Sequence, residues 1–286
     1  MASVIRRESN QPKARPDARA QASIDLATFV RALGVPDLPP RTSPFDPGYD
    51  PATVESHLVQ SGRLITRLKL SMACWLIAEQ SATEAKIARA RSLGVPLVSG
   101  GGPFEIARAR GRLDEFLELC ANMGIDRIEA GEGFTTPVDD PEDLVRHAAS
   151  YGLEVQAELG EKQGGAFDEL TVAQVIDRGA RWLDAGAKQI VVEARESAQG
   201  VGLFDDRMGF NARAADAFAA AWGLDKTLFE APTKRSQFDL MSHFGNEVNL
   251  GNVRLEEVLR VEIYRRGLHA DSYAQHLAER PDAELQ

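Results

Sequence analysis

The sequence predicts an α/β protein of one fold class, a (β/α)8 TIM barrel, from three observations. Apolar strand-like segments alternate with amphipathic helical segments along most of the chain. Eight such strand segments can be counted, which is the number that closes this barrel. The chain has 286 residues, close to the roughly 250 residues that the barrel takes as one domain. The alternative is an open doubly wound sheet, but its glycine-rich GxGxxG turn does not occur in the sequence.

The predicted strands are short apolar runs, several of them rich in β-branched residues. They span residues 41–45, 67–73, 96–100, 126–131, 153–158, 188–194, 226–231 and 247–252. Between them lie segments such as 103–123 and 171–185, whose apolar residues recur at spacings of three and four. This alternation predicts repeated βα units.

Glycines mark the points at which four predicted helices end. Gly94, Gly124, Gly152 and Gly186 each precede an apolar run directly, where a helix C-terminus favours a left-handed residue. The beginning of one helix is predicted by Ser81 with Glu84, which have the spacing of a capping box. These signals set the helix boundaries around the third to sixth strands.

Composition restricts the setting and the partners. A net charge of -10 gives no general reason to bind nucleic acid or an anionic membrane. Two cysteines and no long apolar run indicate a reduced, cytoplasmic protein without a membrane span. We expect a barrel over residues 24–275, a disordered N-terminal tail over 1–23 and a C-terminal tail over 276–286.

Charged and polar side chains gather at the C-terminal ends of the predicted strands, which is the face where barrel active sites are built. They are Asp46, Lys69, Glu129, Glu158, Lys162, Glu193, Arg195, Glu196, Glu230, Lys234, Asn249 and Asn252. Such a mixture suits a small anionic substrate and a hard metal held by carboxylates. The glycines before Pro103 predict a helix N-terminus that favours an anion. Among so many charges, Lys162 is predicted to have a lowered pKa and to exchange protons near neutrality.

Five segments in order resemble the phosphosulfolactate synthase family. They are residues 98–117 (VSGGGPFEIARARGRLDEFL), 193–205 (EARESAQGVGLFD), 228–234 (LFEAPTK), 244–252 (FGNEVNLGN) and 265–273 (RRGLHADSY). The resemblance runs from about Thr42 to Tyr273. It implies a barrel that joins sulfite to phosphoenolpyruvate with Mg2+, as a homo-oligomer.

The resemblance also implies roles for individual residues. Lys162 matches the family's catalytic lysine, and Glu158 and Arg195 would assist it. Metal ligands would be Glu129 and Glu193. The substrate would meet a set of matching or substituted positions: Lys69, Gly100, Gly101, Glu161, Lys234, Asn249, Asn252 and His269.

Departures from the family pattern fall on the same face. Glu161 stands where the family has a lysine, and His269 stands where it has an arginine. By Coulomb's law, a reversed charge near a bound anion changes the binding energy of that anion by roughly several kcal/mol. Three interpretations of the function therefore stay open. They are the family activity, a lyase with a changed substrate, and a non-catalytic scaffold.

Overall fold

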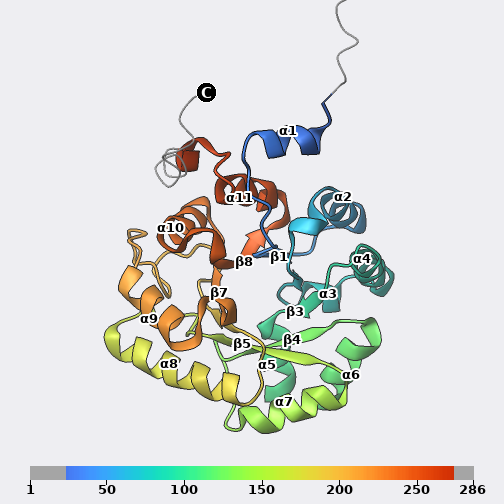
Figure 1. The fold of residues 1–286 in the computed structure, drawn as a ribbon. Coiled ribbons are helices and arrows are strands. Elements are labelled where there is room, and N and C mark those ends of the chain that lie inside the picture. The colour runs from blue at the N-terminus through green and yellow to red at the C-terminus, as the bar shows by residue number, and fades with distance from the viewer. Residues whose placement is uncertain (1–23, 274–286) are drawn as a thin grey trace, which may run out of the picture. The chain divides into compact units, whose positions relative to one another are not determined.

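The computed structural model describes residues 24–273, and its central feature is a closed barrel of eight parallel strands (Figure 1). Strand order follows chain order, and the eighth strand pairs with the first to close the ring. The strands are β1 Thr42–Asp46, β2 Leu68–Leu70, β3 Leu97–Ser99, β4 Arg127–Gly131, β5 Glu154–Leu159, β6 Ile190–Val192, β7 Thr227–Glu230 and β8 Asn249–Arg254. All eight predicted strands and the (β/α)8 fold are therefore confirmed.

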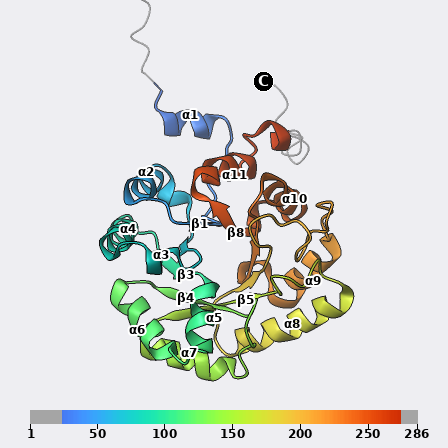
Figure 2. The ribbon, with the colours of Figure 1, turned by 180° about the vertical axis from the view of Figure 1, so that it is seen from behind.

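From α2 onward, helices alternate with the strands and ring the barrel, as Figures 1 and 2 show from opposite sides. The labelled α-helices are α1 Leu26–Ala32, α2 Pro51–Ser61, α3 Cys74–Ile77, α4 Gln80–Ser92, α5 Gly101–Ala109, α6 Leu113–Met123, α7 Pro141–Ser150, α8 Glu169–Asp184, α9 Ala212–Trp222, α10 Lys234–Phe244 and α11 Val258–Arg265, and residues 270–273 are also helical. Single 3-10 turns lie at Gly62–Leu64, Leu224–Lys226, Gly245–Glu247 and Leu255–Glu257.

The chain divides into two compact units, one up to Pro36 and one from Asp37 onward. Helix α1 belongs to the first unit, and the Asp25 carboxylate caps it by accepting a 2.7 Å hydrogen bond from the Thr28 N–H. The whole barrel belongs to the second unit. The predicted tails, 1–23 and 276–286, lie outside the described residues, and the domain limits stay a prediction.

The glycine signals are confirmed. Gly94, Gly124, Gly152 and Gly186 have φ angles of 70°, 84°, 77° and 102°, and each lies within two residues of the end of a helix. Left-handed backbone of this kind carries a steric cost for any residue with a Cβ. Each helix can therefore stop at its glycine and leave the next residues free to enter a strand.

The capping box predicted at Ser81 and Glu84 is wrong. Helix α4 begins one residue earlier, at Gln80, with Glu79 as its N-cap and no side-chain hydrogen bond at the cap. Ser81 therefore already lies inside the first turn. A capping box does form at the start of α10, on Thr233.

The strands are buried on both faces, as expected for a parallel sheet covered by helices. Every residue of β1, β2, β3, β6 and β7 is buried. The barrel nevertheless contains charged side chains, among them Lys69, Glu129 and Glu158. Buried charges are costly unless they are paired, so their positions point to a site.

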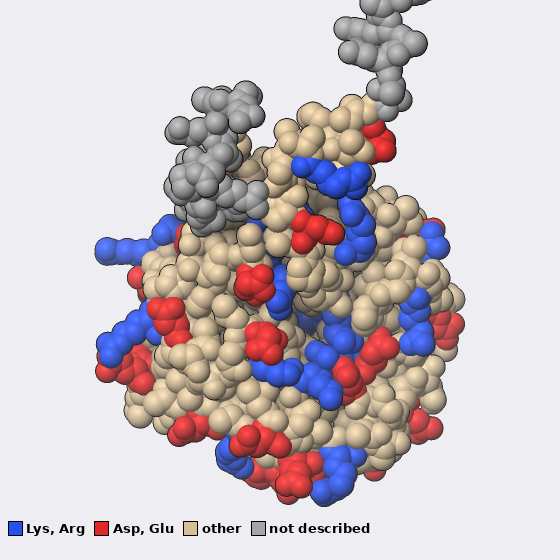
Figure 3. Space-filling view, in the orientation of Figure 1, with Lys and Arg blue, Asp and Glu red and all other residues tan. Residues whose placement is uncertain are grey.

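Charges are mixed over the molecular surface. On the face shown in Figure 3, basic side chains gather about a central hollow with acidic ones among and around them. At the N-terminal end of the barrel, Arg127 and Arg67 lie 2.6 and 3.6 Å from the Glu154 carboxylate. Within residues 24–273, none of the helices combines the length and the apolarity that a membrane crossing requires.

Candidate active site

A cavity of about 660 Å3 opens where the strands finish, bordered by the strand ends and the loops that follow them. Its volume is in the range of pockets that enclose small-molecule ligands. It occupies the face on which barrel enzymes place their chemistry. Lys69, Glu158, Lys162 and Glu193 all contribute to its wall.

Lys69 is the centre of the cavity floor. Its ammonium lies 2.6 Å from Glu129, 3.3 Å from Glu158 and 3.2 Å from Glu230, and the residue is only 7% exposed. Burial alone would lower the pKa of Lys69, but the three carboxylates hold it well above its usual range. Lys69 is therefore a fixed positive charge that ties β2 to three other strands, β4, β5 and β7.

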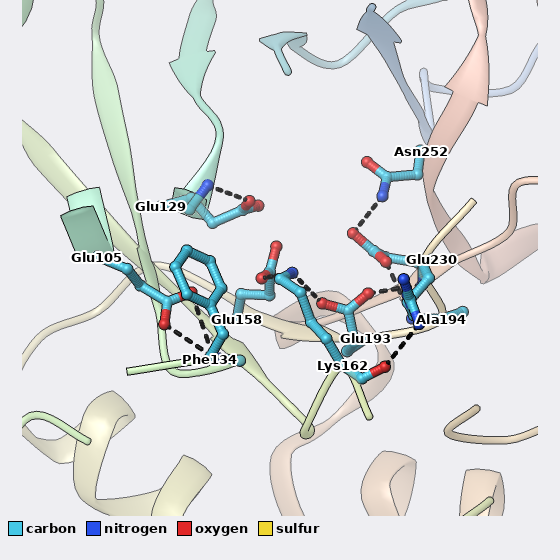
Figure 4. A network of polar contacts seen from close by, with 12 residues as sticks. Glu105, Glu129, Phe134, Glu158, Lys162, Glu193, Ala194, Glu230 and Asn252 are labelled. Atoms are coloured by element: carbon cyan, nitrogen blue, oxygen red, sulfur yellow. Dashed lines mark hydrogen bonds and ion pairs between the residues drawn. The ribbon is translucent and has the colours of Figure 1, made fainter. Parts of the chain in front are cut away.

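Lys162 is the second ammonium of the cluster. It lies 2.7 Å from a Glu158 oxygen and also pairs with Glu193, and Figure 4 shows it between those two carboxylates. Burial would lower its pKa, but Glu158 and then Glu193 hold it above the usual range. The prediction of a lowered pKa is wrong, because the nearest charges to Lys162 are all acidic.

The four carboxyl groups of the cluster differ in their pKa values. Burial would raise the pKa of Glu158, but Lys162 and Lys69 hold it below its usual range. Burial, with the charges of neighbouring carboxylates, raises the pKa of Glu193 and of Glu230. Burial likewise raises the pKa of Glu129, to about 8. Four carboxyls share two ammoniums, so they are not all ionised at neutral pH.

The structure tests which of these carboxylates has room for a cation. Both oxygens of Glu129 are occupied, by the Gly101 N–H at 3.0 Å, the Gln156 amide at 2.8 Å and Lys69, and Glu129 does not border the cavity. Glu193 and Glu230 do border it. In the described part of the chain, no three acidic, His or Cys side chains form a complete metal-binding group. The oxygens of Glu193 are also occupied, by Lys162 and the Arg195 N–H, and those of Glu230 by Lys69, the Asn252 amide and the Ala194 N–H, so the two differ from Glu129 only in bordering the cavity. Mg2+ is often held by one or two carboxylates and completed by substrate and water, and at Glu193 and Glu230 it would displace one of these partners.

Three cavity residues have unusual backbone geometry. Met72, Arg195 and Asn252 have φ angles of 53°, 58° and 50°. Left-handed backbone at such residues persists where surrounding contacts impose it, often at functional sites. The contact at Arg195 is a 2.6 Å hydrogen bond from its N–H to Glu193. The Asn252 amide donates to Glu230, while its buried Oδ1 has no hydrogen-bond partner.

Gly100 and Gly101 pack loops together instead of leaving N–H groups free. A Cβ on Gly101 would lie 3.1 Å from the Gly131 Cα and 3.2 Å from a Glu158 oxygen, and one on Gly100 would lie 3.2 Å from the Met72 nitrogen. Helix α5 begins at Gly101, two residues before the predicted start at Pro103. The Gly101 N–H donates to Glu129, so it is not free for the anion predicted there.

Asn249 lies at the opposite end of the barrel from the cavity. It is the first residue of β8, and its amide donates to the Leu224 and Thr227 carbonyls at 2.7 and 3.1 Å. Its role is to fix the entry of β8 beside β7. Asn249 was expected on the cavity face, but because it starts β8 it lies at the other end of the barrel.

Three further candidates also lie outside the cavity wall. The Lys234 ammonium pairs with Asp271 at 3.1 Å, and His269 lies 3.7 Å from the same carboxylate. Glu161 borders a neighbouring groove between the loop after β5 and α8. The cavity thus brings together Lys69, Gly100, Gly101, Glu158, Lys162, Glu193, Arg195 and Asn252.

Sequence reasoning gave no role to Glu105 and overlooked the apolar part of the wall. The fully buried Glu105 carboxylate accepts hydrogen bonds from the Gly133, Phe134 and Thr135 N–H groups, at 3.2, 2.9 and 2.8 Å. It thereby holds the loop after β4, and Figure 4 shows Phe134 on that loop. The sequence signal that could have identified Glu105 is its place on the buried face of the amphipathic helix α5.

A (β/α)8 barrel with paired lysines and glutamates at its C-terminal face has the architecture of a barrel enzyme. The family model described as (2R)-phospho-3-sulfolactate synthase (ComA) matches residues 40–271. The chain belongs to this family. The resemblance read from the sequence motifs is therefore confirmed.

Curated relatives agree. The phosphosulfolactate synthase of Methanocaldococcus jannaschii is 31% identical over 229 residues, which are 80% of this chain and 91% of that protein. That of Methanothermobacter thermautotrophicus is 28% identical over 233 residues, 81% of this chain and 90% of that protein.

Solved structures of other enzymes share only the fold. Deoxyribose phosphate aldolase from Aeropyrum pernix superposes with a TM-score of 0.51 at 17% identity, over 79% of this chain and 89% of that one. KGPDC from Streptococcus mutans gives the same TM-score at 12% identity, over 85% and 99%.

Proposed function

We propose that this chain is a carbon–sulfur bond-forming lyase that adds sulfite to phosphoenolpyruvate or another enolpyruvate-type acceptor. One observation carries the proposal: Lys162 borders the cavity as a protonated ammonium held between Glu158 and Glu193. Family membership supplies the reaction class.

The reaction needs a proton donor and stabilisation of negative charge. The sulfite sulfur lone pair forms the new C–S bond to the methylene carbon, and the C=C electron pair moves toward the carboxylate. Lys162 then delivers its proton to the adjacent carbon. The carbon of such an aci-carboxylate is far more basic than an amine, so a lysine kept protonated by two carboxylates suits this step.

The other cavity residues bind and position. Arg195 borders the cavity and, in the described residues, forms no ion pair with a carboxylate, so it would hold the anionic end of the acceptor. Lys69 is engaged by three carboxylates and would position Glu158 and Glu230. Mg2+ would be held by Glu193 and Glu230, and when bound it would supply positive charge beside the substrate carboxylate.

A second candidate is the same reaction on a changed acceptor. Three basic side chains border the cavity, Lys69, Lys162 and Arg195, against four acidic ones, Glu158, Glu193, Glu196 and Glu230. Two of these cations, Lys69 and Lys162, are already engaged by carboxylates, which favours an acceptor with fewer negative charges than phosphoenolpyruvate. A non-catalytic scaffold is disfavoured, because a buried cluster of this kind is costly to maintain without a ligand.

The test is product formation by the purified full chain. Incubation with phosphoenolpyruvate, sulfite and Mg2+ is expected to give a new sulfonate by mass spectrometry, and omission of sulfite or enzyme should remove it. Failure to form a sulfonate from phosphoenolpyruvate or from any other unsaturated acid would contradict the proposal.

A further inference from the structure

The cavity wall is divided by chemistry. Its charged side chains come mainly from the strands and loops β5 to β7, whereas the loops after β2, β3 and β4 contribute uncharged ones. Three of these are large and apolar: Met72 after β2, Ile106 in α5 after β3, and Phe134 after β4. We call these three residues the apolar wall.

The apolar wall is exposed although it borders a cavity. Met72, Ile106 and Phe134 are 42%, 42% and 53% exposed. Single exposed apolar residues are ordinary on protein surfaces. Three that converge on one concave site, from three successive loops, are typical of ligand pockets, which are lined mainly by apolar and aromatic side chains.

The backbone that presents these side chains is held in place. The Phe134 N–H donates to the buried Glu105 carboxylate at 2.9 Å, and both its neighbours, Gly133 and Thr135, donate to the same group. Met72 has a left-handed φ of 53°. Its loop packs so closely against Gly100 that a Cβ added at Gly100 would lie 3.2 Å from the Met72 nitrogen. The apolar wall is therefore a preformed surface.

We propose that the acceptor taken by this site is an unsaturated carboxylate that carries an apolar substituent of aryl size, packed on the apolar wall. This inference rests on the function proposed above and specifies its substrate. The carboxylate would meet Arg195, and the reacting carbons would lie toward Lys162. Placing the substituent on Met72, Ile106 and Phe134 removes apolar area of both partners from water.

Charge supports an apolar substituent over a second anionic group. Two of the three cations in the wall, Lys69 and Lys162, are already engaged by carboxylates. Arg195 is the lining cation that, within residues 24–273, has no carboxylate partner. One anionic end of the acceptor can be matched there, whereas the opposite side of the cavity offers uncharged surface.

The chemical step needs no further reactant. The sulfite lone pair forms the C–S bond to the β-carbon, the π pair of the alkene becomes the new bond at the α-carbon, and the proton comes from Lys162. Solvent or sulfite's own proton restores the ammonium. No oxidant or reductant is required, and nothing leaves the acceptor.

A matched series of acceptors tests the inference. Acrylate carries no substituent, while 2-phenylacrylate and 3-phenylacrylate carry one phenyl ring on the α- or the β-carbon. Dissociation constants are measured by calorimetry without sulfite, and sulfonate formation is followed separately with sulfite and Mg2+, after subtraction of the uncatalysed addition. We expect at least one phenylacrylate to bind 10-fold or more tightly than acrylate.

Two variants locate the effect. Phe134→Ala should remove most of the preference for a phenylacrylate and leave acrylate binding within about 2-fold. Ile263→Ala is the matched control for Ile106→Ala, since Ile263 on α11 is similarly exposed, at 38%, but lies outside the cavity wall. Ile106→Ala should weaken phenylacrylate binding, and Ile263→Ala should not.

The outcomes separate the inference from the proposed function. If phosphoenolpyruvate and sulfite give a sulfonate but the phenylacrylates bind no better than acrylate, the inference is overturned and the function stands. If a phenylacrylate binds in a Phe134-dependent manner but no acceptor yields a sulfonate, the apolar ligand class stands and the lyase function fails. If Phe134→Ala weakens acrylate and phenylacrylates equally, the inference is overturned, because the wall then acts only through loop structure.

Discussion

The charged side chains of the cavity wall already have partners within the protein, whereas the apolar side chains are left exposed for a ligand to cover. Lys69, Glu158 and Glu230 are each less than 10% exposed, and Lys69 pairs with both carboxylates. Phe134 is 53% exposed. Its backbone N–H donates a hydrogen bond to Glu105, but no hydrogen bond holds its ring. Fixed charges of the first kind can stabilise a developing charge without reorganising. Exposed apolar surface of the second kind gains free energy only when something covers it.

This difference separates the part of the wall that would carry out the reaction from the part that would select the acceptor. The charged part is built mainly from strand ends, whose positions the barrel fixes, with Lys162, Arg195 and Glu196 in the loops that follow. It suits a step common to related enzymes. The apolar part is built from loops, which vary more readily than the scaffold. Substitutions in the first part should affect rate and stability, and substitutions in the second should affect choice of acceptor.

The largest effect is expected for Lys162→Ala. Loss of the proton donor should reduce sulfonate formation by about 10²–10⁴-fold, the range of general acid catalysis. Steady-state rates by mass spectrometry measure this, with circular dichroism to show that the variant folds. Lys234→Ala is the control, because Lys234 is half exposed and pairs with Asp271 away from the cavity, so near-normal rates are expected. Equal losses in both variants would remove Lys162 from its proposed role.

Lys69→Met should have the largest effect on stability. It removes a buried ammonium that pairs with three carboxylates, and breaking a buried ion pair costs about 3–5 kcal/mol. Urea denaturation measures the change in free energy of unfolding. Lys226→Met, at an exposed position, is expected to change it by less than about 0.5 kcal/mol. A fully stable Lys69→Met protein would show that the three carboxyls are protonated without it.

Stability should fall as pH rises through neutrality. Burial raises the pKa of Glu129 from its ordinary 4.5 to about 8, so between these values the folded protein binds more protons than the unfolded one. The free energy of unfolding therefore decreases with rising pH in that window, by about 1–3 kcal/mol, and Glu129→Gln should flatten the profile. Denaturation at pH 5.5, 7 and 8.5 measures it. Stability that rises over this range would be the opposite sign and would place the proton elsewhere.

The sequence was sufficient for the barrel and for the centre of the site. Eight strands and four glycine caps could be predicted because both signals are local: apolar runs, and a backbone conformation that glycine tolerates best. Lys162, Glu158 and Glu193 could be placed near one another because parallel strands bring their C-terminal ends to one face. Topology alone carries that inference.

Errors arose where the direction of a side chain or a shift of two residues mattered. Strand β8 was expected at 247–252 and lies at Asn249–Arg254, which puts Asn249 at the wrong end for a ligand. Lys234 begins α10 instead of ending a loop, and its ammonium lies 5.0 Å from the centroid of the Phe238 ring. The pKa of Lys162 was predicted in the wrong direction because its neighbours' signs, which decide the shift, depend on packing.

Glu105→Gln is expected to have an effect of intermediate size, and it tests which of the two parts of the wall Glu105 supports. The Glu105 carboxylate accepts hydrogen bonds from three N–H groups and the Thr135 hydroxyl, and an amide of the same shape can accept at only one of its two ends. We expect the loop that carries Phe134 to loosen, with KM for a phenylacrylate raised about 10-fold, on the order of one charged hydrogen bond, and kcat for acrylate nearly unchanged. A parallel fall in kcat for both acceptors would mean that Glu105 supports the charged part instead.

The smallest effect is expected for Glu161→Lys, which installs the residue that the family places there. At the sequence level Glu161 was the strongest reason to expect a changed substrate. Its side chain is exposed and borders the groove beside α8, not the cavity, and interactions between solvent-exposed charges are weak and screened by salt. KM for phosphoenolpyruvate and for acrylate should therefore change by less than about 2-fold, corresponding to about 0.4 kcal/mol, measured at low and at physiological salt. A salt-sensitive gain of 10-fold or more for phosphoenolpyruvate alone would show that the charge at position 161 reaches the cavity, and acceptor choice would then depend on the charged part of the wall as well as on the apolar one.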